Sequence, residues 1–159
     1  MPSSPLPRRL RVALTTLLLV LPACGSNIVE PIDPIPLDFA VARDRWAQTA
    51  PAAYQYTLRR SCFCGPDATR GVVIVVRNGT VESRRYADTG ADVAPNLASS
   101  FPTIDGLFVI ILDSFVANPG QTTVTYDAAR GIPVTIAILG SPMIADDESF
   151  YTTSDFIVR

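Results

Sequence analysis

Cys62 and Cys64 are the side chains whose type and spacing are most open to chemistry. They stand one residue apart, just before Gly65-Pro66, which signals a bend. In an oxidising exterior, two thiols this close pair unless geometry forbids it. The residues leave three interpretations open: a local structural disulfide, a redox couple or soft-metal site, and separate free or intermolecular thiols. We favour the local disulfide, although so small a ring adds little stability.

A run of acidic residues, Asp146, Asp147 and Glu148, is the second candidate site. Carboxylate oxygens are the ligands that Ca²⁺ prefers, so the run is a candidate metal site. The chain has no Asp-x-Asp-x-Asp-Gly spacing, however. A solvated loop ahead of the last strand is therefore the preferred interpretation, and we predict no cofactor.

The absence of two residue types restricts catalysis more than any motif does. The chain has no histidine, and all 13 of its basic residues are arginine. Without histidine, one chain cannot build Ser-His-Asp or Cys-His catalysis or an imidazole metal site. Without lysine, it has no Schiff base, Ser-Lys dyad or lysine-containing phosphate loop. We therefore expect that the protein is not an enzyme.

The first 23 residues have the layout of an export signal: arginines, then the apolar segment 12–21, then small residues. That segment is far shorter than the ~20 residues that a bilayer-spanning helix needs. Leu21-Pro22-Ala23-Cys24 is typical of a bacterial lipobox, in which Cys24 carries diacylglycerol and becomes the N-terminus. The alternative is an ordinary secretory signal with an incidental cysteine.

Residues 24–37 contain several prolines without helical or strand periodicity, which predicts a tether between the lipid and a domain. At ~3.1 Å per residue, an extended tether would reach about 40 Å from the membrane. Gly25 follows the anchor cysteine in place of the aspartate that retains lipoproteins at an inner membrane. We therefore expect the outer membrane if the cell has two, with the domain outside the cytoplasm.

Charge argues against a nucleic-acid partner. Removing residues 1–23 leaves 10 arginines against 15 acidic residues, a net charge of −5. A protein with net negative charge is a poor binder of polyanions, because phosphate contacts dominate such affinity.

Residues 38–159 have the length of one domain with a real core. Asp38 is the expected cap of a first helix that buries Phe39, Ala42 and Trp46. Asn78-Gly79 predicts a two-residue hairpin turn, because both residues readily take positive φ. The predicted strands are 54–62, 72–77, 80–86, 122–126, 133–139 and 150–158, with a loop over 87–100.

A second helix, opened by Pro102-Thr103, carries the strongest periodicity in the chain. One apolar stripe recurs at helical spacing: Ile104, Leu107, Phe108, Ile111, Leu112 and Phe115. Val109, Ile110 and Val116 widen this stripe, and we prefer a broad core-facing surface to a partner surface for them.

These elements predict the fold class α+β. We expect a single two-layer domain, with an antiparallel sheet of five to six strands and two helices on one face. A helix followed by three strands occurs twice, which suggests two αβββ halves.

Four distinct blocks are spread along this domain: 54–58 running into Cys62-Phe63-Cys64, then 101–108, then Tyr126-Asp127 with Gly131 and Pro133, then 145–148. Together they resemble an uncharacterised bacterial family of unknown function, found in exported and lipid-anchored proteins. The resemblance covers about residues 39–157. It implies an exported αβ domain and assigns no activity, ligand or catalytic residue.

The sequence thus predicts a lipid-anchored protein of the bacterial envelope that binds an envelope protein or a small ligand without catalysis. The alternative is a thiol-disulfide redox or soft-metal-handling protein that uses Cys62 and Cys64.

Overall fold

The computed structural model describes residues 35–117, 120–140, 144 and 146–159. The predicted signal peptide 1–23, the lipidation site Cys24 and all of the tether before residue 35 lie outside these residues.

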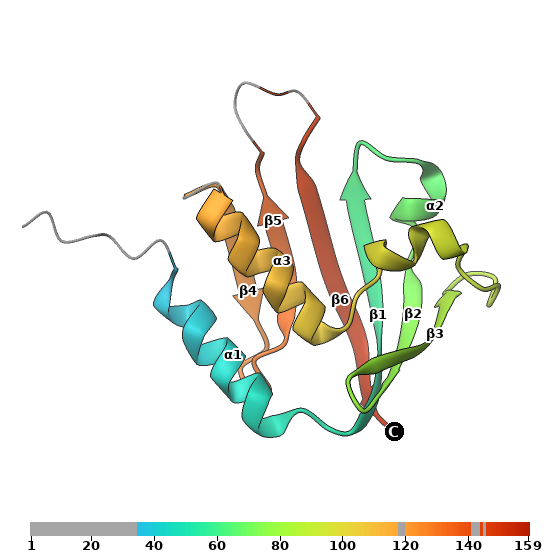
Figure 1. Ribbon diagram of the computed structural model, residues 1–159, viewed down its shortest axis with the longest axis horizontal. Coiled ribbons are helices and arrows are strands. Elements are labelled where there is room, and N and C mark those ends of the chain that lie inside the picture. The colour runs from blue at the N-terminus through green and yellow to red at the C-terminus, as the bar shows by residue number, and fades with distance from the viewer. Residues whose placement is uncertain (1–34, 118–119, 141–143, 145) are drawn as a thin grey trace, which may run out of the picture. The chain divides into compact units, whose positions relative to one another are not determined.

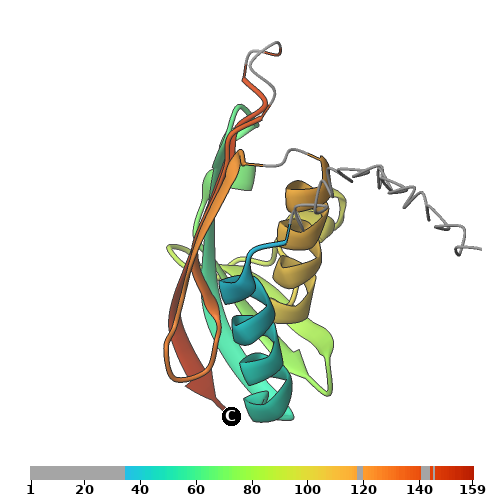
Figure 2. The same cartoon turned by 90° about the vertical axis from the view of Figure 1, so that its left-hand side faces the viewer.

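The domain is a single α+β unit built on one six-stranded antiparallel sheet, in the order β3-β2-β1-β6-β5-β4. Figures 1 and 2 show that the helices α1 and α3 cover one face of this sheet. The predicted fold class is therefore confirmed. The elements are α1 (Leu37–Thr49), β1 (Ala53–Cys62), α2 (Pro66–Thr69), β2 (Val72–Arg77), β3 (Thr80–Tyr86), η1 (Pro95–Ser100), α3 (Ile104–Ala117), β4 (Thr122–Tyr126), β5 (Pro133–Ile138) and β6 (Ser149–Val158).

Two three-stranded meanders form the sheet, and each follows a helix in the chain. The first is β1-β2-β3 and the second is β4-β5-β6, which gives the predicted αβββ order twice. The antiparallel pairing of β1 with β6 joins the two meanders into one sheet.

The core lies between the sheet and the two helices. Side chains alternate along a strand, so β1 turns Tyr54, Tyr56 and Leu58 to the helices, while Gln55 and Thr57 between them face the other way. The aromatic rings of Phe39 on α1 and Phe108 on α3 meet edge to face, 5.8 Å apart, and join the helices over this layer.

Local sequence decides the hairpin between β2 and β3. Asn78 and Gly79 have φ of 48° and 75°, the left-handed values that a tight hairpin turn requires.

Helix α1 begins at Leu37, one residue before the predicted boundary. Asp38 therefore lies inside the first turn, where its Oδ1 accepts a hydrogen bond of 2.8 Å from the Phe39 amide. The one-turn helix α2 and the 3-10 helix η1 were not predicted, because neither has a full period of apolar residues.

The outer side of α3 corrects one prediction. Val109 is 57 % exposed and Val116 is 63 % exposed. The main stripe is buried except for Leu112, which is half-buried, as is Ile110. A core-facing position is therefore wrong for both valines. The sheet covers only one side of α3, so a residue on the helix's far side stays in solvent even when it is apolar.

Candidate functional site

The predicted cysteine pair lies at the end of β1. Cys62 is the last residue of the strand, and the structure joins it to Cys64 by a disulfide with Cα atoms 5.3 Å apart. The Cys64 amide donates a hydrogen bond of 2.8 Å to the Cys62 carbonyl, which closes the turn that brings the two residues together. The bend expected before Pro66 is thus present, and the close pairing of these cysteines is confirmed.

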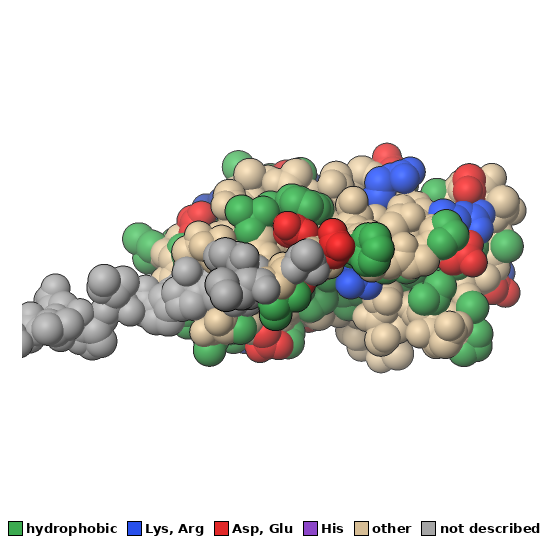
Figure 3. All heavy atoms as spheres, turned by 90° about the horizontal axis from the view of Figure 1, so that it is seen from above, with side chains coloured by type: hydrophobic (Ala, Val, Ile, Leu, Met, Phe, Trp, Pro, Cys, Tyr) green, Lys and Arg blue, Asp and Glu red, His purple; other side chains and the backbone are tan. Residues whose placement is uncertain are grey.

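Exposed apolar side chains lie at this strand end and in the segment that leads into β6. Phe63, between the two cysteines, is 83 % exposed. Ile144 and Phe150 are also exposed, and Phe150 stands opposite Ser61 of β1 in the sheet register. Figure 3 looks onto this end of the molecule, where apolar surface lies among acidic and basic side chains. Cys64 is itself exposed and Cys62 is half-buried, so the disulfide is accessible to another molecule.

The acidic run 146–148 precedes β6. Asp146 and Glu148 are exposed, while Asp147 is half-buried against Gly140. Over the described residues, no group of three or more cysteine or acidic side chains is arranged to hold a metal ion.

The block 101–108 proves to be a structural corner. Phe101 is fully buried, and the Tyr56 hydroxyl donates a hydrogen bond to the Pro102 carbonyl. The Ile104 amide, at the start of α3, donates a 3.2 Å hydrogen bond to the Tyr54 hydroxyl. These contacts fix the entry of α3 onto β1, so the block needs no catalytic explanation.

Burial sets the ionisation of the two tyrosines at this corner. Burial raises the pKa of Tyr54 to about 12, although the hydrogen bond from Ile104 opposes the shift. Burial also raises the pKa of Tyr56 well above its ordinary value. Both phenols are therefore neutral at physiological pH and act as fixed hydrogen-bonding groups.

The block around Tyr126-Asp127 is structural as well. The Asp127 carboxylate accepts a 2.7 Å hydrogen bond from the Arg130 amide inside the β4–β5 loop. Gly131 has φ of 76°, and a Cβ on it would lie 2.1 Å from the carbonyl oxygen of Ala42 in α1. The loop therefore lies directly on the α1 backbone, and only glycine fits there.

A different surface has the shape of a binding site. The sheet face turned away from α1 and α3, called the open face below, carries in its rows Gln55, Thr57, Val73, Val75, Ser83, Arg85, Thr135 and Thr152. A hollow of about 350 Å³ lies on it over β1, β2 and β3. Val73 and Val75 line this hollow together with Arg85 and Arg159.

Sequence reasoning did not find this hollow. A continuous apolar run such as that in β2 indicates only that a strand is covered on both faces or in part. The structure confirms partial cover, because the inward residues of β2 are buried while Val73 and Val75 are half-buried. The signal that could have revealed the hollow is the pairing of Val73 with Arg85, an apolar residue on the outward side of β2 opposite an arginine of β3.

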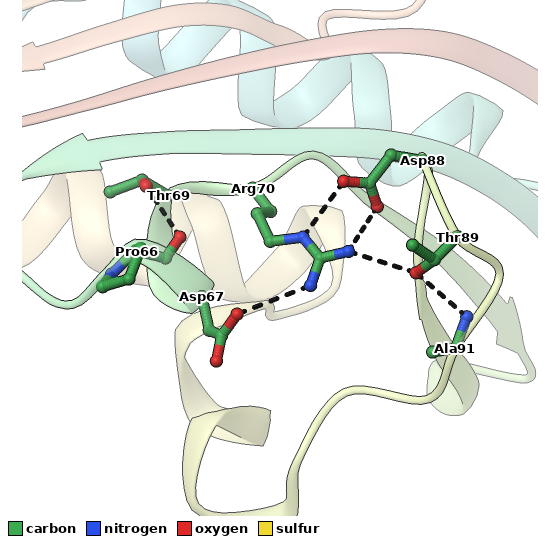
Figure 4. A network of polar contacts seen from close by, with 7 residues as sticks. All are labelled: Pro66, Asp67, Thr69, Arg70, Asp88, Thr89 and Ala91. Carbon is green, nitrogen blue, oxygen red and sulfur yellow. Dashed lines mark hydrogen bonds and ion pairs between the residues drawn. The ribbon is translucent and has the colours of Figure 1, made fainter.

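A polar network holds the turn at one side of the hollow (Figure 4). The Arg70 guanidinium contacts both carboxylate oxygens of Asp88, at 2.6 and 3.2 Å, and reaches Thr89 at 3.1 Å. The same guanidinium lies 3.8 Å from the ring centroid of Tyr86. Arg70 also pairs with Asp67 at 3.4 Å, so α2 and the turn after β3 are tied together.

On the helix side, two grooves follow the junction of α1 and α3. One, of about 580 Å³, is lined by residues that include Leu37 and Phe39, and the other, of about 270 Å³, includes Trp46 and Asp105. Arg43 and Leu112 line both grooves. Among the residues that the structure describes, no helix is long and apolar enough to cross a membrane.

A model of a family of unknown function, DUF6174, matches residues 38–158. The chain belongs to this family. The match confirms the resemblance to a family without an assigned function, over nearly the same residues. Comparison with curated proteins and with solved structures gives no significant match.

Proposed function

We propose that this protein is a lipid-anchored component of the bacterial envelope that binds an envelope partner through the open face, without catalysis. One observation carries the proposal. Both long helices lie on one side of the sheet, which leaves the opposite face solvent-accessible and hollowed over β1, β2 and β3. A hollow of about 350 Å³ falls within the range of small-ligand sites.

The anchor is supported by sequence. The lipobox ends at Cys24, and α1 begins at Leu37, so few residues separate the lipid from the domain. Two or three acyl chains hold a protein firmly at a bilayer, because each buried methylene contributes about 0.8 kcal/mol.

Residue types support binding in place of catalysis. The chain has no histidine or lysine, and all of its basic residues are arginine. Arginine recognises carboxylates and phosphates through its planar set of donors, but it is a poor general base.

Site-specific photo-cross-linking in cells tests the binding face. A photoreactive residue at Thr152, on the open face, is expected to capture a defined envelope component. A matched probe at Val109, on the outer side of α3, is expected not to capture it. Equal capture at both positions, or capture from Val109 alone, would overturn the assignment of the open face.

Labelled palmitate tests the anchor separately. We expect incorporation into the full chain and none into Cys24→Ala, with the variant released from membranes by salt-free washing. A variant that sediments with membranes as firmly as the parent chain would refute anchoring through Cys24.

A second candidate function is thiol-disulfide exchange, and the exposure of the Cys62–Cys64 bridge favours it. A thiolate of a partner dithiol would attack one sulfur of the bridge, which releases the other as a thiolate and forms a mixed disulfide. The second partner thiolate would then break that mixed bond. The partner leaves oxidised to a disulfide, and Cys62 and Cys64 are left reduced, with two electrons and two protons transferred.

Equilibration with glutathione buffers distinguishes a structural bridge from an exchanging one. Structural disulfides in secreted proteins have potentials below about −300 mV. A potential well above that value supports exchange, whereas a bridge that resists reduction excludes it.

For a ring of this size, replacing both cysteines with serine is expected to lower the free energy of unfolding by about 1.5 kcal/mol.

A further inference from the structure

The hollow on the open face combines an apolar floor with a cationic rim. Val73 and Val75 project from β2 and are half-buried, so each still presents methyl groups to solvent. Across the sheet, Val73 stands opposite Arg85 of β3, and Val75 stands opposite Ser83. An apolar group placed in the hollow would cover the two valines and release water from them.

Two guanidinium groups border this floor from different elements. Arg85 comes from β3, and Arg159 follows β6. The Arg159 Nε donates a 2.7 Å hydrogen bond to the Gln55 side chain, which directs the guanidinium along β1. No acidic residue lines the hollow within the described part of the chain. The site is therefore cationic on a domain whose net charge is negative.

The charge balance of the rim points to a monoanion. Arg85 forms an ion pair with Asp92, with Nε and Oδ1 3.2 Å apart. Both side chains are strongly exposed, so this pair is weakly held and open to competition. The side chains of Arg85, Arg159 and Asp92 together carry a surplus of one positive charge. A carboxylate fits that surplus better than a phosphate, whose charge is nearer −2 at neutral pH.

The turn beside the hollow is already ordered. Gly90 belongs to the lining, and its amide donates a 2.8 Å hydrogen bond to the Tyr86 carbonyl. Between Tyr86 and Gly90, the Asp88 carboxylate is held by the Arg70 guanidinium, as Figure 4 shows. Since ordering this turn on binding would cost affinity, a preformed turn favours a small ligand.

We propose that this hollow binds a small ligand that joins a carboxylate to an apolar body. The apolar body lies over Val73 and Val75, and the carboxylate accepts hydrogen bonds from Arg85 and Arg159 in place of Asp92. The inference rests on the proposed function, because it names the chemistry that the open face recognises.

Methyl NMR titrations of the full chain test the ligand class with three probes. Phenylacetate combines a carboxylate with an apolar ring, phenylacetamide lacks the charge, and inorganic phosphate lacks the apolar body. Phenylacetate is expected to shift the methyl signals of Val73 and Val75 with a Kd of about 1 mM. Phenylacetamide should bind at least about tenfold more weakly, and phosphate should leave these methyl signals in place.

Variants assign the contacts. Arg85→Gln and Arg159→Gln should each weaken phenylacetate binding about tenfold, whereas Asp92→Asn should strengthen it several-fold because it removes the competing carboxylate. Arg43 is exposed on α1, on the other side of the sheet. Arg43→Gln removes the same charge there and should leave the Kd for phenylacetate unchanged. Circular dichroism checks that the folds match.

Three results would overturn the proposal: no saturable shift at Val73 and Val75, equal affinity for phenylacetamide, or phenylacetate binding that survives both arginine substitutions. Failure of this site and failure of the partner surface are distinguishable. Capture by the Thr152 photo-probe without phenylacetate binding would retain the open face and reject the ligand. Phenylacetate binding without that capture would retain the ligand site and reject the partner surface.

Discussion

The indole Nε1–H of Trp46 donates a 3.1 Å hydrogen bond to the carboxylate of Asp105. Trp46 is 1 % exposed and lies on α1, whereas Asp105 is in the first turn of α3. The contact therefore ties together the two helices that cover the sheet, and it satisfies the only polar atom of a buried aromatic ring.

Removing this hydrogen bond should destabilise the domain. We expect Asp105→Ala to lower the free energy of unfolding by about 1–2 kcal/mol, because the indole N–H then loses its acceptor. Urea denaturation followed by circular dichroism measures the change. Asp113→Ala, an exposed position on the same helix, should stay within about 0.5 kcal/mol of the parent chain. Equal effects of the two substitutions would show that the Trp46 contact contributes nothing.

Two glycines with the same backbone conformation should differ in their tolerance of alanine. Gly131 and Gly79 have φ of 76° and 75°. A Cβ added to Gly131 would lie 2.1 Å from the Ala42 carbonyl oxygen, whereas a Cβ added to Gly79 would meet no atom within 4 Å. Gly79→Ala should therefore cost about 1 kcal/mol from the left-handed backbone alone. Gly131→Ala should cost at least about 3 kcal/mol, because the loop must also leave α1. Denaturation midpoints compare the two, and similar losses would contradict close packing of the loop.

Alkaline pH should unfold the domain through its buried tyrosines. Burial raises the pKa of Tyr54 to about 12 from an ordinary value of 10.0, and it also raises the pKa of Tyr126. The neutral phenol is the form that folding favours, so this stabilisation is complete below pH 10 and is lost as the pH rises from 10 towards 12.

A titration above pH 10 that follows the absorbance of the phenolate, measured with and without urea, checks this expectation. Native Tyr54 and Tyr126 should ionise only at higher pH than in the unfolded chain. Tyr54→Phe should reduce the loss of stability above pH 10. Full ionisation of all five tyrosines near pH 10 in the folded protein would refute it.

Acid should act on the turn beside the hollow. The hydrogen bond from Arg70 lowers the pKa of Asp88 below its ordinary value of 3.8. The ion pair therefore stabilises the turn above pH 3.8 and is lost as the pH falls through the lower folded-state value. The substitution Arg70→Gln should return the pKa of Asp88 towards 3.8, and NMR titration of the carboxyl groups measures this change.

Arg77→Gln provides a matched control for this titration, because Arg77 pairs with Glu82 instead, 3.6 Å away. It should leave the pKa of Asp88 unchanged. Arg70→Lys keeps the charge but loses the two-point contact with the carboxylate, so it should give an intermediate value. Indistinguishable titrations in all three variants would exclude the Arg70 contact as the cause.

The sequence by itself determined the two long helices and the six strands of this domain. Asn78-Gly79 favours positive φ within two residues, and the stripe from Ile104 to Phe115 repeats at helical spacing, so both the β2–β3 hairpin and α3 could be predicted. The Cys62–Cys64 pairing was predictable for the same reason, since it depends on neighbours in the chain.

Only the tertiary structure decided which distant residues meet. The pairing of β1 with β6 joins two meanders, and no local pattern specifies that junction. It brings Arg159 beside Gln55, while the register of β2 with β3 sets Arg85 opposite Val73. Long-range pairing reflects the burial of the whole sheet under two helices, a free energy summed over many residues and invisible in any short segment.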